Sequence, residues 1–205
     1  MADKNKIKYG ICNVYFSEID SYDATEGYTY KEPVKFPGAV SMSLSATGSN
    51  NPFYADNIVY TTSETNTGYE GDFEVAKVID AFKKDILGVV FDETTKQWFE
   101  SADAVSKEFA LGFEFDGDVS KTRYWLYRCK AEKPDIASQT KEETADPQTE
   151  TLALTIMPRE NDHQVLTWAE PDGTNYATWF ESVKQPVTEN GDDTQNGDDT
   201  QNGGN

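Results

Sequence analysis

The most constraining feature of the sequence is a period-two pattern of large apolar residues over Phe109–Phe115. Alternate residues of a strand share a face, so the Phe and Leu side chains of this segment form one apolar face. The turn-forming residues Asp116–Asp118 follow, and the aromatic run Arg123–Ala131 comes after them. Together these segments predict an antiparallel β-hairpin.

Alternating, β-branched and aromatic runs recur along the chain and predict further strands. They cover Tyr9–Phe16, Ala39–Ser45, Ile58–Thr65, Tyr69–Val78, Val89–Phe91, Gln97–Glu100, Thr151–Met157 and Gln164–Trp168. Polar segments rich in turn residues predict loops at Ser17–Pro37, Thr47–Asn57 and Glu132–Gln148, and a turn at Asn66–Gly68. Strands therefore make up most of the predicted structure.

The segment Ile79–Leu87 favours an α-helix, because its apolar residues recur at helical spacing and Gly88 follows where helices commonly end. A second, short helix is predicted at Ala177–Lys184. No β–α–β alternation occurs, so we predict an all-β fold, an antiparallel β-sandwich or partial barrel with one flanking α-helix. We expect these side chains in the core: Ile79, Phe82, Ile86, Phe109, Leu111, Phe113, Phe115, Leu152, Leu154 and Ile156.

The chain has 205 residues, of which 18 are Lys or Arg and 37 are Asp or Glu, so its formal net charge is −19. Proteins that bind nucleic-acid phosphates or anionic membrane surfaces need clustered Lys and Arg, and this composition argues against both classes. Residues 189–205 repeat the hexamer NGDDTQ and contain no apolar side chain. We therefore predict one domain at residues 1–188 and a disordered acidic tail at residues 189–205.

The N-terminal segment Met1–Lys8 is polar and lacks the apolar core of a signal peptide. The longest apolar stretch, Ile86–Phe91, is too short to cross a bilayer. These two features predict a soluble protein made in a cytoplasm.

Few residues support a catalytic site. His163 is the single histidine and lies in a polar turn, with no Ser or Cys motif that points to it, so we expect it at the surface. One histidine also excludes a His-rich metal site. No phosphate-binding loop or nucleophile elbow occurs, and we expect no enzyme activity, metal or cofactor. Cys12 and Cys129 are expected to be buried strand thiols, although a single bridge between them stays open.

Two other functional classes stay open. The acidic pairs Glu114/Asp116 and Glu142–Glu143 can mimic the carboxylates of a glycoside hydrolase, but so many acidic residues produce pairs by chance. Trp98–Phe99 and Trp179–Phe180 can form the platform of a carbohydrate-binding module. Core or interface anchors are the simpler interpretation of both aromatic pairs.

The predicted strand Ala39–Ser45 has an unusual pattern, because its polar face is small and uncharged. One face holds Val40, Met42 and Leu44, which we expect in the core, and the other holds Ser41, Ser43 and Ser45. The loop predicted after it carries Pro52, Phe53 and Tyr54 among polar residues. Exposed aromatic residues on a loop are typical of a partner surface, unless they fold back onto their own domain.

Several segments carry a resemblance to a known family. They are YGICNVYFSEI, VKFPGAVSMSLSATGSNNPFYADNIVY, NTGYEGDFEVAKVIDAFKKDILGVVFDE, and FALGFEFDGDVSKTRYWLYRCKAEKP leading to QTETLALTIMPR. In this order they resemble the major tail protein (tail tube protein) family of long-tailed phages and prophages of Gram-positive bacteria. The resemblance covers most of Lys8–Lys184, excludes the NGDDTQ tail and includes no catalytic signature.

The resemblance implies a structural virion protein that is assembled in the bacterial host cytoplasm. Members of the family form six-membered rings that stack into a tube, and genomic double-stranded DNA passes through the lumen without specific binding. The implied partners are further copies of the chain and the tape measure, tail terminator and distal tail proteins, with no membrane. An acidic body is compatible with this role, because a basic wall would retain DNA.

Two hypotheses about sites follow from the resemblance and the strand pattern. The loop after Ser45 is expected to contact the next ring through Asn50, Asn51, Pro52, Phe53 and Tyr54. The serine face is expected to line the lumen, together with an acid on the adjoining strand: Ser41, Ser43, Ser45 and Glu64.

Overall fold

The computed structural model describes residues 10–55, 57–118, 120–138, 140 and 147–186. For residues 50, 51, 53–55, 59 and 61–64 it describes the backbone but not the side chains. The acidic tail predicted at residues 189–205 and the N-terminal segment Met1–Lys8 lie outside the described residues.

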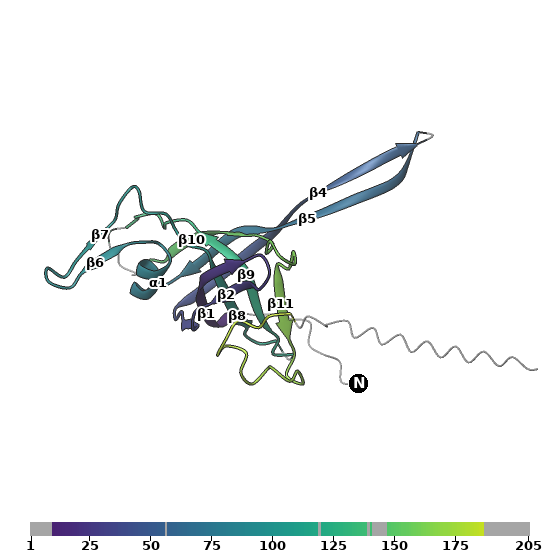
Figure 1. Cartoon of the computed structure of the whole chain (residues 1–205). Helices are drawn as coiled ribbons and strands as arrows, with labels where there is room; N and C mark the ends of the chain where they lie inside the picture. Colours follow the sequence, from purple (N-terminus) through teal and green to yellow (C-terminus); the bar gives the residue numbers. More distant parts are fainter. Residues whose placement is uncertain (1–9, 56, 119, 139, 141–146, 187–205) are drawn as a thin grey trace, which may run out of the picture.

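The described chain contains eleven strands and one short helix (Figure 1). In chain order they are β1 (Ile11–Asp23), β2 (Gly27–Tyr30), β3 (Val34–Lys35), β4 (Ala39–Ala55), β5 (Ile58–Val75), α1 (Asp80–Asp85), β6 (Val90–Asp92), β7 (Gln97–Phe99), β8 (Phe109–Phe115), β9 (Arg123–Ala131), β10 (Glu150–Ile156) and β11 (Leu166–Ala169). The predicted all-β class is confirmed.

One large antiparallel sheet has the strand order β2-β1-β8-β9-β10-β5-β4. Strand β3 also pairs with β1, and β11 pairs with the first half of β9. Strands β6 and β7 form a separate hairpin. The predicted hairpin of Phe109–Phe115 with Arg123–Ala131 is therefore confirmed with its bounds, as β8 and β9.

The sheet curls around a single main core. Phe36 contacts both Phe16 on β1 and Phe73 on β5, with ring centroids 6.2 Å and 5.6 Å away. Because β1 and β5 are separated by three strands in the sheet, this contact requires the sheet to fold back on itself. All of the predicted core residues on β8 and β10 are buried except Phe115, which is half-buried at the end of its strand.

Helix α1 closes one end of this core. The buried ring of Phe82 meets Phe16, Phe36 and Phe109 edge to face at 5.1–5.2 Å. Gly88 follows the helix with a φ of +71°, a conformation that glycine adopts without strain, so that the chain turns toward β6. The predicted apolar face of the helix therefore packs on the sheet as expected.

The C-terminal segment, residues 171–186, covers the outer face of β8 and β9. Trp179 and Val183 form a second buried cluster with Trp125 and Tyr127 of β9. The helix predicted at Ala177–Lys184 is wrong, since this segment is a series of turns. The Trp125 indole N–H donates to the Trp179 carbonyl, and the Tyr127 hydroxyl donates to the Lys184 carbonyl. Side chains of β9 thus bind carbonyl groups of the segment, and tertiary contacts override its helical pattern.

Two predicted loops are also wrong. The segment Ser17–Pro37 instead continues β1 and contains β2 and β3. The segment Thr47–Asn57 belongs mostly to β4, and the predicted turn Asn66–Gly68 lies inside β5. Polar side chains of β4 and β5 form hydrogen bonds with each other across the strand pair, as in the 3.0 Å bond between the hydroxyls of Ser49 and Thr65. A composition that is typical of loops therefore forms a long hairpin.

Candidate assembly surfaces

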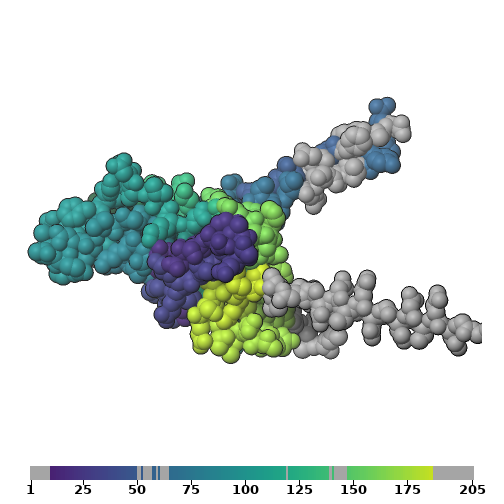
Figure 2. All heavy atoms as spheres, viewed as in Figure 1, coloured from purple at the N-terminus to yellow at the C-terminus, as the bar shows by residue number. Residues whose placement is uncertain are grey.

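The hairpin of β4 and β5 projects far beyond the rest of the sheet (Figures 1 and 2). Toward the tip of this hairpin, the pairing of β5 with β10 ends at Tyr69. Beyond it, the described residues of β5 pair with β4 alone, and we call Gly48–Ala55 and Ile58–Gly68 the arm. At a rise of about 3.3 Å per residue, the arm extends about 26 Å from the body.

The predicted contact residues Asn50, Asn51, Pro52, Phe53 and Tyr54 all lie in the β4 strand of the arm. The arm is thus a paired ribbon, although a loop was expected there. Of these five residues, only the side chain of Pro52 is described, and it is exposed. Pro52 lacks an N–H, and on an outer strand it discourages indiscriminate pairing with another strand.

The three predicted serines lie on the exposed face of β4. Ser41, Ser43 and Ser45 are exposed, while Met42 and Leu44 pack against the core. The expectation that Val40 is in the core is wrong. A β-bulge places Val40 as an extra residue between the Ala39–Val75 and Ser41–Glu74 pairs, and its side chain is exposed.

Acidic residues of β5 lie directly opposite these serines. Ser41, Ser43 and Ser45 pair with Glu74, Asp72 and Glu70, whereas the predicted Glu64 pairs with Asn50 on the arm. Together with Thr151 and Thr155 of β10, they form what we call the acidic face: Ser41, Ser43, Ser45, Glu70, Asp72, Glu74, Thr151 and Thr155. The period-two acidic pattern of Glu70–Glu74 was the sequence signal that could have located these carboxylates.

Hydrogen bonds organise one end of the acidic face. The Thr149 hydroxyl donates to Glu74 Oε1 over 2.7 Å, and the Ser41 hydroxyl donates to Glu74 Oε2 over 2.8 Å. These two bonds lower the pKa of Glu74 below its ordinary value, because they stabilise the charged carboxylate. Glu74 therefore remains ionised at neutral pH, and the face is hydroxyl-rich and negatively charged.

The candidate catalytic residues do not converge. His163 is exposed in the turn between β10 and β11, as expected. The carboxylate of Glu114 binds Asn13 and Arg123, and Glu142–Glu143 lie outside the described residues. Within the described part of the chain, no group of three or more His, Cys, Asp or Glu side chains is placed to hold a metal ion.

The cysteines occupy strands of the large sheet. Both Cys12 and Cys129 are free thiols; the first is half-buried and the second is buried. Burial raises the pKa of the Cys129 thiol, so it is protonated at neutral pH.

The two predicted tryptophan platforms differ in exposure. Trp179 is buried in the second cluster and offers no platform. Trp98 is partly exposed on β7, and its ring lies 4.7 Å from that of Phe91 on β6. Trp98 also lines a groove of about 500 Å³ together with Leu87, Val89 and Ile136.

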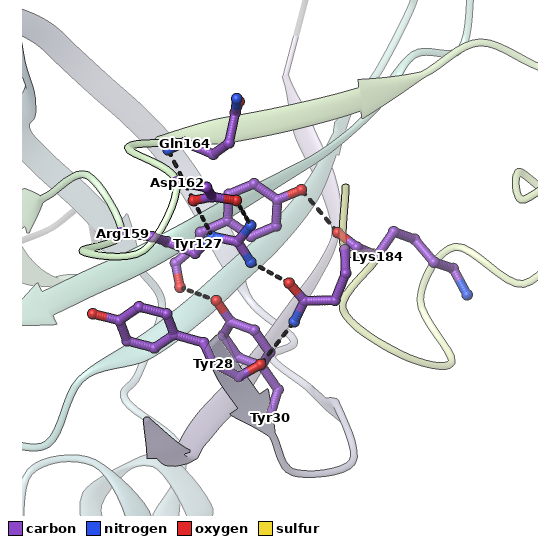
Figure 3. A network of polar contacts seen from close by, with 8 residues as sticks. Tyr28, Tyr30, Tyr127, Arg159, Asp162, Gln164 and Lys184 are labelled. Carbon is purple, nitrogen blue, oxygen red and sulfur yellow. Dashed lines mark hydrogen bonds and ion pairs between the residues drawn. The ribbon is translucent and has the colours of Figure 1, made fainter. Parts of the chain in front are cut away.

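A buried arginine, which sequence reasoning did not single out, anchors the end of the C-terminal segment (Figure 3). Arg159 is 1% exposed, forms an ion pair with Asp162 and donates a hydrogen bond to the Gln185 side-chain oxygen. Its guanidinium group lies 4.3 Å from the centre of the Tyr127 ring. The Gln185 amide donates in turn to the Tyr28 carbonyl over 3.0 Å. A single Arg in a polar turn gives no sequence signal for such a network.

A comparison with known protein families finds no match to this chain, and a comparison with curated proteins finds no similar sequence. No helix among the described residues is long and apolar enough to cross a membrane. The features of this chain that bear on its function are therefore the arm and the acidic face.

Proposed function

We propose that the chain is a structural subunit of a tube, the tail tube protein of a long-tailed phage. The observation that carries this proposal is the arm, which extends about 26 Å from the body as a ribbon of two strands among the described residues. A two-stranded hairpin is at best marginally stable in water. A neighbouring subunit that packs against the arm would supply the missing contacts.

The free edge of β4 supports lateral assembly in the same proposal. Strand β4 ends the order of the large sheet, so the outer edge of Ala39–Thr47 is unpaired within the described residues. An exposed edge is a liability in a monomer, but it becomes an assembly device when a strand of a neighbouring copy completes the sheet. Sheets joined in this way around a ring would form a continuous wall.

The acidic face gives that wall a surface suited to passing DNA. Its carboxylates on Glu70, Asp72 and Glu74 are about 7 Å apart along β5. Because they have the same sign as DNA phosphates, they would prevent the counterion release that makes basic surfaces retain DNA. We therefore assign the lumen to this face, with Ser41, Ser43 and Ser45 on its outer strand.

Electron microscopy of the concentrated purified protein tests this proposal, with rings or hollow tubes as the expected result. A matched variant replaces residues 50–64 by an Asn-Gly turn, which joins the paired residues Ser49 and Thr65. This variant should stay folded, because it loses no core residue, and should no longer stack. A wild-type chain that never forms rings or tubes contradicts the proposed function. Normal tubes from the shortened variant would show that stacking does not require the arm.

A further inference from the structure

Large exposed apolar side chains gather at one end of the molecule. On the β6–β7 hairpin, the paired residues Val90 and Phe99 are 63% and 51% exposed. Trp98 is 38% exposed on the other face of the same hairpin, and Ile136 beside it is fully exposed. We call this end, formed by β6, β7 and the groove they share with Ile136, the lobe.

The lobe has a groove that the body does not fill, and apolar and charged side chains line it together. Leu87, Val89, Trp98, Pro134 and Ile136 line it, and its volume is about 500 Å³. Five charged side chains also line the groove: Lys83, Glu100, Lys133, Asp135 and Glu150. Lys133 pairs with Glu100 over 2.9 Å, and Glu150 accepts a hydrogen bond from the Val78 N–H over 2.7 Å. An apolar side chain could therefore pack on Leu87, Trp98 and Ile136 where these three charged groups already have partners.

The arm carries exposed apolar side chains of its own. Ile58 is 64% exposed and Tyr60 is 72% exposed near its tip. Residues 48–68 include two acidic residues and no basic one, in a chain whose net charge is −19. Two such chains repel each other, and the arm is a part of the surface that carries little of this charge.

We propose that the lobe of one copy receives the arm of a second copy. The arm and the lobe lie on opposite sides of the body, with the arm at the upper right and the lobe at the left of Figures 1 and 2. A contact between two different surfaces on opposite sides of one chain is heterologous, and it propagates through many copies. This inference rests on the proposed tube function and names the surface that the arm binds.

The size of the arm also favours a second copy over a small ligand. Its described residues are Gly48–Ala55 and Ile58–Gly68. Stable protein interfaces use roughly 20–30 residues a side, and the arm supplies about this number. The groove alone is too small for such a contact, so Val90 and Phe99 extend the proposed interface beyond it.

Two charged substitutions test the contact from its two sides. Ile136→Asp alters the lobe and Ile58→Asp alters the arm, and both side chains are exposed, so neither change removes core packing. Each variant alone should need at least about tenfold more protein than wild type to stack. The matched control Ile136→Leu keeps an apolar side chain at the same position and should stack normally.

Mixing the two variants gives the decisive result. The intact arm of Ile136→Asp can bind the intact lobe of Ile58→Asp, but the contact cannot propagate. The mixture should therefore form complexes limited to two layers, as measured by analytical ultracentrifugation and electron microscopy. If Ile136→Asp forms tubes as readily as wild type, or the mixture forms no limited complex, the lobe is not the receptor of the arm, although the tube proposal survives.

Disulfide trapping gives a second measurement that does not depend on tube formation. The double variant Ile58→Cys/Ile136→Cys, in a Cys12→Ser background, should form a ladder of linked chains when a concentrated solution is oxidised. The single variant Ile58→Cys should give no species larger than a dimer. A double variant that also stops at the dimer overturns the inference.

Discussion

Replacing Gly112 by Ala should destabilise the fold, because Gly112 lies beneath the indole ring of Trp125. A Cβ atom at Gly112 would lie 2.8–2.9 Å from three ring atoms of Trp125, well inside the ordinary contact distance of 3.4–4 Å. Trp125 is fully buried and directly opposite Gly112 in the β8–β9 pair. Its N–H also donates to the Trp179 carbonyl over 3.0 Å, so the ring has little freedom to retreat.

The expected magnitude follows from three opposing effects. Overpacking of this kind costs about 1–3 kcal/mol, and a weakened indole hydrogen bond adds about 1 kcal/mol. Alanine also lowers the conformational entropy of the unfolded chain, which stabilises the folded state by about 0.4–1 kcal/mol. We therefore expect Gly112→Ala to lower the free energy of unfolding by about 2 kcal/mol.

Equilibrium unfolding in urea, followed by far-UV circular dichroism, measures this change. For an m-value of about 2 kcal/mol/M, the midpoint should fall by about 1 M. The matched control is Gly10→Ala, because no atom lies within 4 Å of a Cβ built there. The control should stay within about 0.5 kcal/mol of wild type. If Gly112→Ala is as stable as Gly10→Ala, the C-terminal segment does not hold the Trp125 ring in place over Gly112.

Three other predictions address the core, the pH dependence and the lumen. Phe82→Ala should lower the free energy of unfolding by about 3–5 kcal/mol in thermal denaturation, because its buried ring contacts three others; a loss below about 1 kcal/mol would contradict the position of α1. Burial raises the pKa of Glu18, but hydrogen bonds from Lys107 and Lys31 outweigh it and hold this pKa below the ordinary 4.5. The resulting stabilisation is present above about pH 4.5 and is lost as the pH falls through the lowered pKa. As the pH falls, the free energy of unfolding should therefore drop less steeply in Glu18→Gln than in wild type, and equal slopes would refute this role of Glu18. Ser43→Lys, reconstituted into particles, should slow DNA ejection at low salt and recover at high salt, and unchanged kinetics at low salt would place β4 away from the lumen.

The sequence alone determined the elements whose pattern is local. Strands β8 and β9, the β6–β7 hairpin and the apolar face of α1 lie where periodicity and turn residues predict them. Each of these elements has a pattern that only one regular structure can bury. The all-β class follows from the same reasoning, since the sequence shows many strand patterns and no β–α–β alternation.

Tertiary structure decided the features on which the proposed function depends. The arm combines Asn, Gly and Ser residues that predict a loop, and only pairing with β5 makes them a strand. A bulge at Val40 and the register opposite Ser41 set which carboxylates join the acidic face, and register is a property of two strands together. The C-terminal turns and the Arg159 network depend on partners far away in the sequence. Local patterns carry no information about such partners, because their contacts exist only once the sheet has curled.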